Sequence, residues 1–522
     1  MQNAKSAGGL FLCLATALVT MPQGALGQAC PGNPLQSNGP DVIVGTIAQT
    51  QGSQQISNYS DNAGMDVFSI GTTSCNLGDT TLDWISSNNH HPVIAQNCYR
   101  LSEDPAGYTK FEQMGQSWLK HGFCALSEFA CCNNCQGTSC SSLGLGCSDP
   151  YTAGRNATQS NLGPKWQVNA TTGVFTYPPA NPAWSTSVDR RLQIHTSDLE
   201  VSNSNHTMPL ADEPRFYVEG QYVTQDDAES GNKNNNVSWR PINVTGGPTN
   251  WSFSVYDTPN PPGGAQQGHT RRQEEALWAW QDVDPSVFIK QGVTDELSAD
   301  AGGNPNLEKA KVLMGSNVTD LGGGMWHYEY AVHNVNSHRS FKSFSIPIDA
   351  TANVTNAEFH DVDYHSGDGP GNTNMDGTDW AFQVVPGSPV QKFVRWDMQE
   401  TDPENRRNAL RWGTLYNFRF DADVPPLTSG KGQATLDYYR AATMGEAANI
   451  VLFAEAPAPC TPGDLNADGQ RNGQDIVIFN DIVLGLVVPT AEQICSGDQA
   501  SPFNTITIED AGAFVDSLVV AP

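Results

Sequence analysis

The residues with the clearest chemical signature form a short loop near the carboxyl end of the chain. Oxygen-bearing side chains occupy loop positions 1, 3, 5, 9 and 12, which are Asp464, Asn466, Asp468, Asn472 and Asp475. Gly469 at position 6 suits a sharp turn, and Gln470 at position 7 offers its backbone carbonyl. Ca²⁺ prefers about six to eight oxygen ligands, and alternate residues of a tight loop direct their oxygens to one centre. The spacing therefore predicts one calcium ion.

Histidines and carboxylates supply a second group of candidate metal ligands. The candidates are His91, His121 and His195 in the front part of the chain and His327, Glu329 and His333 further along. The last three alternate along a predicted strand and would share one of its faces, and Asp361–His365 shows the same alternation. Converging imidazoles and carboxylates can hold Zn²⁺ or Cu²⁺ for hydrolytic or oxidative chemistry. A purely structural role, as a helix-end cation, a turn residue or a solvent-facing strand residue, is the competing interpretation, and for the Asp/Gly-rich segment 361–371 it is a polar loop.

The cysteines are concentrated in the front part of the chain. After Cys13, which lies in an apolar leader, nine follow up to residue 147, namely Cys30, Cys75, Cys98, Cys124, Cys131, Cys132, Cys135, Cys140 and Cys147. We expect disulfides with one cysteine left over, and a zinc knot around residues 131–147 is the alternative. Cys460 and Cys495 are expected to pair with each other, because every other cysteine lies far away at or before residue 147.

The calcium loop resembles half of a known duplicated module. An apolar helical pattern follows it from Ile476 to Leu486, and Asp475 stands at position 12 where Glu is usual in calcium hands. In these features residues 460–522 resemble a type I dockerin. The resemblance implies a small helical module that binds a cohesin-like protein, often in systems that degrade polysaccharides. Degenerate copies of the module also occur as calcium-stiffened tails with no known partner, and this is the interpretation that we favour. The second repeat is degenerate, because placing Asp510 at position 12 puts Phe503 at position 5. The resemblance thus implies one calcium ion.

Targeting and charge indicate where the protein acts. Residues 1–27 read as an export signal, with an apolar stretch from Leu10 to Thr20 and small residues before Gln28. No later segment is long and apolar enough to predict a membrane span. The formal net charge is −28, from 27 Lys and Arg against 55 Asp and Glu. A chain without a basic face is a poor nucleic-acid binder, so we expect a secreted protein with no nucleic-acid partner.

The remaining pattern predicts a mainly β protein of several domains. We expect a Cys-rich mixed β domain over 28–235, a β-sandwich-like domain over 236–453, a linker over 454–459 and the helical module over 460–522. Strands are predicted at 326–332, 343–348, 415–422 and 449–453 from alternating apolar residues and turn residues. Within the front domain one helix is predicted, over 109–121, because Phe111, Met114 and Trp118 fall on one helical face.

Function is less sharply indicated than fold. Blocks such as GQSWLKHGF and HYEYAVHN are similar to uncharacterised secreted proteins of environmental bacteria, a resemblance that implies no mechanism. We predict an extracellular calcium-binding protein with a binding or structural role, whose partner is a cohesin-like protein or an extracellular polysaccharide. The alternative is a polysaccharide-active hydrolase or a His-ligated copper or zinc enzyme. Trp278 and Trp280 are either a sugar-stacking platform or, more commonly in such folds, part of the core.

Overall fold

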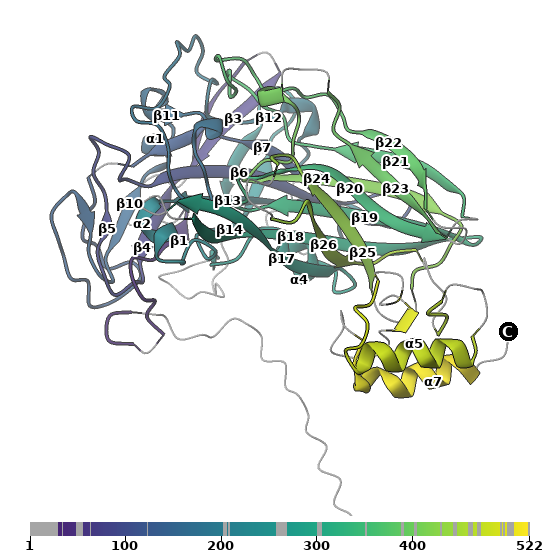
Figure 1. Cartoon of the computed structure of the whole chain (residues 1–522). Helices are drawn as coiled ribbons and strands as arrows, with labels where there is room; N and C mark the ends of the chain where they lie inside the picture. Colours follow the sequence, from purple (N-terminus) through teal and green to yellow (C-terminus); the bar gives the residue numbers. More distant parts are fainter. Residues whose placement is uncertain are drawn as a thin grey trace, which may run out of the picture.

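The computed structural model is mainly β, as the sequence predicts (Figure 1). It describes residues 30–33, 35–48, 56–62, 64–122, 124–201, 206, 209–256, 269–299, 305–349, 352–387, 391–400, 404–427, 431–441, 446–457, 463–466, 471–490, 493, 496–497 and 506–519. The expected export signal lies outside the described residues. Within the described part of the chain, no helix combines the length and the apolar character needed to cross a membrane.

Two antiparallel sheets build the front part of the chain. The smaller consists of β1 (Val42–Ile47), β4 (Thr72–Asn76) and β10 (Ser148–Tyr151). The larger has the order β15-β14-β13-β6-β7-β12-β3-β2, with β8, β11 and β16 attached beside it. Its strands are β2 (Ile56–Asn62), β3 (Met65–Ile70), β6 (Val93–Glu103), β7 (Thr109–Gln116), β8 (Leu119–His121), β11 (Leu162–Gly163), β12 (Leu192–His195), β13 (Arg215–Val223), β14 (Val237–Thr245), β15 (Ser252–Val255) and β16 (Arg271–Arg272). An apolar core that includes Val44, Phe68 and Val218 fills the space between the two sheets.

Two five-stranded sheets follow and enclose one core between them. The first has the order β17-β18-β19-β24-β21 and the second β22-β23-β20-β25-β26. Their strands are β17 (Phe288–Ala299), β18 (Pro305–Gly322), β19 (Met325–Asn334), β20 (Phe341–Asp349), β21 (Val354–His360), β22 (Ala381–Pro386), β23 (Gln391–Asp397), β24 (Thr414–Ala422), β25 (Gly432–Tyr438) and β26 (Asn449–Ala454). All four predicted strands are confirmed here. Phe418 lies at the centre of the core and stacks on Phe344 of the opposite sheet, with ring centroids 4.3 Å apart.

Short elements connect these sheets. They are β5 (Leu82–Asp83), β9 (Ser142–Leu143), α1 (Ala153–Asn156), α2 (Gln225–Glu229), α4 (Trp278–Val283) and the 3₁₀ turns η1 (Gln159–Asn161), η2 (Lys165–Gln167), η3 (Thr196–Asp198) and η4 (Glu404–Arg406). A further 3₁₀ turn, η5 (Ile508–Asp510), belongs to the helical unit near the carboxyl end. Trp280 of α4 is fully buried and donates a hydrogen bond to Thr109 Oγ1 at 2.7 Å. A flat exposed platform formed by Trp278 and Trp280 is therefore not present, and Trp280 belongs to the core.

The front and rear parts share a third core, so the sheets stack as four layers. Tyr99, Tyr217 and Trp239 of the large front sheet pack there with Leu313 and Leu415 of the rear part. The front sheet also continues beyond the expected boundary at residue 235, because β14 and β16 pair within it. The change from front to rear part therefore falls after Arg272. Burial between the layers makes the two parts one continuous body.

The helix predicted over 109–121 is wrong. These residues form β7 and β8, and β7 pairs along most of its length with β6. Phe111 packs into the core shared with the rear part, whereas Met114 packs into the core of the front part. Their spacing resembles a helical face only because a central strand buries apolar side chains on both sides.

Four disulfides staple the front part, as the sequence predicts. They join Cys30 to Cys132, Cys75 to Cys131, Cys124 to Cys140 and Cys135 to Cys147. The ninth cysteine, Cys98, is a buried free thiol in β6. Every cysteine of the alternative zinc knot is thus bonded to another. Cys460 and Cys495 lie outside the described residues.

The last described part is a small helical unit below the sheets in Figure 1. Its helices α5 (Gly473–Val483) and α7 (Ala511–Val519) lie side by side, and their core consists of Leu465, Phe479, Ile482, Ile506 and Phe514. The segment before it is only partly a free linker, because Ala454 and Ala456 are buried in the core of the rear sheets.

Candidate functional site

The described ends of the predicted calcium loop meet at the carboxylate of Asp475. Asp475 Oδ1 accepts hydrogen bonds from the backbone N–H groups of Leu465 at 2.8 Å and Asn466 at 3.2 Å. Asp475 Oδ2 accepts one from the backbone N–H of Asn472 at 2.8 Å, and the Asn472 side chain caps α5 in return. Position 12 of the loop is therefore joined to positions 2, 3 and 9, which closes the loop at the positive end of a helix.

The donor set fits a hard cation. Asp464 at position 1 and Asp475 at position 12 are both buried. A carboxylate has about four lone-pair positions, and three backbone bonds leave one of them on Asp475 Oδ2 for a monodentate metal bond. Asn466 and Asn472 add amide oxygens at positions 3 and 9. Asp468 and Gln470 lie outside the described residues.

The second repeat has the same framework without the carboxylates at its start. Thr507 and Asp510 form a capping box in which the Thr507 N–H donates to Asp510 Oδ2 at 2.7 Å. Thr507, Asp510 and Phe514 follow Asn472, Asp475 and Phe479 at a constant interval of 35 residues. Phe479 and Phe514 stack with centroids 4.3 Å apart, so equivalent positions of the two repeats meet in the core. Cys460 and Cys495 are separated by the same interval. The proposed second-repeat positions 499, 501 and 503 lie outside the described residues.

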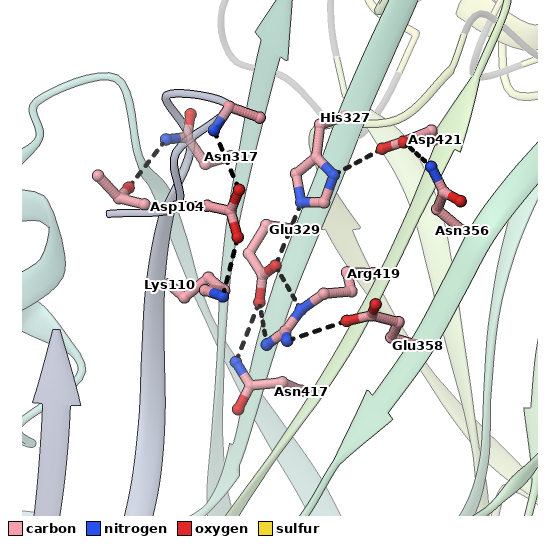
Figure 2. A network of polar contacts seen from close by, with 12 residues as sticks. Asp104, Lys110, Asn317, His327, Glu329, Asn356, Glu358, Asn417, Arg419 and Asp421 are labelled. Carbon is pink, nitrogen blue, oxygen red and sulfur yellow. Dashed lines mark hydrogen bonds and ion pairs between the residues drawn. The ribbon is translucent and has the colours of Figure 1, made fainter. Parts of the chain in front are cut away.

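A layer of polar side chains lies between the front sheet and the first rear sheet, and Figure 2 shows part of it. Arg419 of β24 donates to Glu329 of β19 at 2.8 Å and to Glu112 of β7 at 2.7 Å. Burial alone would raise the pKa of Glu112, but Arg419, His360 and Arg100 hold it well below its ordinary value. The Glu112–Arg419 pair thus joins the two parts through buried charges.

The strand alternation predicted for the histidines is present, but the side chains do not form one cluster. His327 lies between Asp421 Oδ1 at 2.7 Å and Glu329 Oε2 at 3.4 Å (Figure 2), and its ring stacks on Tyr108. His333 shares their face of β19 but lies elsewhere, 3.9 Å from Glu219 Oε1. Burial lowers the pKa of His333 to about 4.

The other candidate ligands are further apart still. His91 and His121 share a hydrogen bond of 3.0 Å between Nε2 and Nδ1 beneath Phe175. His195 is partly exposed and contacts Asp363 at 2.9 Å. Residues 361–365 follow β21 as a loop, so the strand alternation expected there is wrong and the competing interpretation, a polar loop, is confirmed. Among the residues that the structure describes, no three or more His, Cys, Asp or Glu side chains converge as metal ligands.

Several buried ionisable residues escaped the sequence analysis. Glu219 is fully buried and accepts hydrogen bonds from Tyr99 OH at 2.9 Å and the Ala276 N–H at 2.8 Å, and burial raises its pKa. Lys165 is also buried, and its Nζ donates to Gln116 Oε1 at 2.9 Å. The sequence could have indicated Glu219, because a charged residue inside the largely apolar segment FYVEGQYV needs a buried partner.

Comparisons with known proteins show no family for this chain. No family model matches, and no curated protein matches. Among solved structures, the exo-β-D-glucosaminidase CsxA, in complexes with a glucosamine-configured castanospermine and an amino-australine analogue, has 10% identity and a TM-score of 0.14 over 76% of this chain. That match spans only 26% of the glucosaminidase. The collagen adhesin of S. aureus has 8% identity and a TM-score of 0.14, with 78% of this chain and 96% of the adhesin covered.

Proposed function

We propose that the protein is an extracellular binding or structural protein whose C-terminal dockerin-like module binds one calcium ion. The observation that carries the proposal is the joining of the two loop ends, where Asp475 in the first turn of α5 accepts hydrogen bonds from the Leu465 and Asn466 N–H groups and both Asp464 and Asp475 are buried. The constant 35-residue interval between equivalent capping and core positions supports a duplicated module. The second loop lacks carboxylates at positions 1, 3 and 5, so one ion is expected.

The disulfide framework supports a location outside the cytoplasm. Four bridges in one domain form and persist in oxidising compartments. With the predicted export signal, they favour a secreted protein whose body is stapled at its front end.

The exposed surface of the module supports a protein partner of the cohesin type. Eight of the twenty large apolar side chains that are exposed among the described residues belong to this module. They are Ile476, Val477, Leu484, Leu486, Val487, Val488, Ile508 and Val515. Such a density of exposed apolar side chains on a small unit is typical of a binding surface.

Calorimetric titration of the mature protein with Ca²⁺, after washing with a chelator, tests the proposal. We expect one ion per chain. Asp464→Ala removes the ligand at position 1 and should weaken calcium binding by about tenfold or more. The matched control is Asp481→Ala, which removes a carboxylate from α5 outside the loop and should leave the affinity unchanged.

The outcomes separate the alternatives. Two ions per chain would mean that the second repeat also binds calcium and that its alignment is wrong. If the protein binds no calcium, or if Asp464→Ala and the wild type bind it with equal affinity, the loop serves only to cap α5 and the proposal is contradicted.

A further inference from the structure

A buried lysine of the front part lies beside a side-chain amide that a buried carboxylate contacts from the other side. Lys165 of η2 is 4% exposed, Asn97 of β6 is 1% exposed and Glu219 of β13 is fully buried. Lys165 Nζ contacts Asn97 Oδ1 at 3.4 Å, and Asn97 Nδ2 donates to Glu219 Oε1 at 3.1 Å. The amide group therefore lies between an amine and an acid, and the proposed function uses none of the three.

The sheet holds the amide and the acid in place. Strands β6 and β13 are paired, and Asn97 lies directly opposite Glu219 in their register. Glu219 Oε2 accepts a hydrogen bond from the Ala276 N–H at 2.8 Å, and Oε1 accepts one from Tyr99 OH at 2.9 Å. Glu219 thus cannot turn away from Asn97 without losing two further partners.

The amine is held from the other side. Lys165 Nζ donates to the Gly413 carbonyl at 3.3 Å and to Gln116 Oε1 at 2.9 Å. Gln116 is the closer of the two amides, but its Nε2 donates to the backbone carbonyl of Asp363 at 2.9 Å. A carbonyl has no proton to give to a departing amine, whereas a carboxylic acid has one. Asn97 is therefore the amide with an acid at its nitrogen.

The surroundings favour the neutral forms of both ionisable groups. Burial lowers the pKa of Lys165, although attraction to Asp368 and Glu219 opposes the fall, and burial raises the pKa of Glu219. Transfer of a proton from Nζ to the carboxylate gives a free amine and a carboxylic acid. A lysine amine is nucleophilic only without this proton. A site closed to bulk water also keeps hydrolysis from competing with the amine.

We propose that Lys165 and Asn97 form an intramolecular isopeptide bond, with Glu219 as the catalytic acid and base. The neutral Lys165 Nζ attacks Asn97 Cγ, and an N–C bond forms. Glu219 Oε1 gives its proton to Asn97 Nδ2, the Cγ–Nδ2 bond breaks and ammonia leaves. The surplus proton on Nζ passes to Glu219, which regenerates the acid. Amine and amide are thereby converted to a new amide and ammonia, and no electrons are transferred.

The bond would close a loop within the front part. Residues 97 and 165 are 68 positions apart in the chain, and the bond joins β6 to η2. A covalent link of this kind restricts the unfolded chain, as a disulfide does, but it withstands reducing agents. The fully reduced and denatured chain would therefore keep one closed loop.

Mass spectrometry of the mature protein after reduction of its disulfides tests the proposal. We expect a mass below that of the unmodified chain by one ammonia molecule. Protease digestion should give one branched peptide that joins Asn97 to Lys165. Cyclisation of an amino-terminal glutamine such as Gln28 also releases ammonia. The branched peptide, rather than the total mass alone, therefore identifies the bond.

Variants assign the roles. Lys165→Arg keeps the buried positive charge but removes the nucleophilic amine, and Glu219→Gln keeps the shape but removes the acid. Each should abolish the branched peptide. The matched control is Lys311→Arg, because Lys311 is also buried but its Nζ contacts Glu275 at 2.6 Å and the Asn234 carbonyl at 3.3 Å. It should leave the bond intact. Circular dichroism of each variant separates loss of the bond from loss of folding.

Three results would overturn the proposal. A folded wild type without the branched peptide would mean that Lys165 is only a hydrogen-bond donor. A branched peptide between Lys165 and Gln116 would show that the wrong amide is assigned. A bond that forms fully in Glu219→Gln would remove Glu219 from the reaction. None of these measurements involves calcium, so this proposal and the calcium proposal can fail separately.

Discussion

Buried charged side chains between the front sheet and the first rear sheet form ion pairs with one another. Arg419 is the centre of this arrangement, with Glu329 on its own sheet and Glu112 on the front sheet. Asn417 beside it donates to Phe111 O at 2.9 Å and to Glu329 Oε1 at 3.2 Å. These bonds fix the front strand β7 against β24 at one register, because a displaced carboxylate would be buried without a partner.

At the residue scale, the His91–His121 pair predicts a specific dependence of stability on pH. Burial, together with His91 and Lys120, lowers the pKa of His121 from 6.5 to about 3 in the folded protein. Below pH 6.5 the unfolded chain binds a proton that the folded chain does not, so His121 destabilises the fold as the pH falls towards 3. Gln at this position has no such penalty. The stability advantage of the wild type over His121→Gln should therefore shrink by up to about 3 kcal/mol between pH 7.5 and pH 4.

Urea unfolding of both proteins at the two pH values measures this change. Phe175→Leu, which alters the packing around the same two rings without removing a titratable group, should keep the pH dependence of the wild type. A stability difference between wild type and His121→Gln that is the same at both pH values would mean that folding does not lower the pKa of His121.

The residues of β19 also show which features of a site can be predicted from the sequence. The spacing of His327 and Glu329 correctly placed both on one strand face, because side-chain alternation is a local property of a strand. It could not show that His333 on the same face meets Glu219, a residue of a distant strand. Partners of this kind depend on how the sheets pack, and a single sequence does not encode that packing locally.

At the element scale, strand β24 illustrates how packing changes a local pattern. Tyr416, Phe418 and Phe420 face the rear core, as their alternation predicts. The polar residues between them do not face solvent, because Asn417 and Arg419 are buried under β7. The error at β7 has the same origin, since strands covered on both sides lose the simple alternation that distinguishes them from helices.

At the scale of the element, Gly115 in the centre of the front sheet leads to a testable prediction, because two strands approach each other closely there. A Cβ atom on Gly115 of β7 would lie 2.1 Å from the Gln193 carbonyl oxygen of β12. Gly115→Ala must therefore push β7 and β12 apart, and we expect a loss of about 1–3 kcal/mol in the free energy of unfolding. Gly154→Ala in α1 is the matched control, because a Cβ atom there meets nothing within 4 Å.

Chemical denaturation of the two variants provides the measurement, and hydrogen exchange of the Gln193 amide locates the effect. The control should be neutral or slightly stabilising, since alanine favours helix more than glycine does. Equal stability of Gly115→Ala and the wild type would show that β12 moves away at little cost, which would make it a loosely attached strand.

At the scale of the whole molecule, the cores determine which parts unfold together. The core shared by the front and rear parts and the Glu112–Arg419 pair both cross between them. The helical module, in contrast, has its own core around Phe479 and Phe514. The body is therefore expected to behave as one cooperative unit and the module as a second, although the sequence pattern alone divides the body into two domains.

This organisation predicts two thermal transitions in calorimetry of the mature protein, one for the body and a smaller one for the module. Calcium should raise only the module transition, because a ligand stabilises the unit that binds it. Arg419→Met leaves Glu329 buried without its guanidinium partner and Glu112 with Arg100 alone, so it should cost about 3–5 kcal/mol and lower the body transition as a whole. Arg395→Met, which breaks a partly exposed pair with Asp397 and Asp437, should cost about 0–1 kcal/mol. Separate transitions for the front and rear parts in the wild type would contradict the single body, because the shared core and the buried ion pair would then fail to couple them.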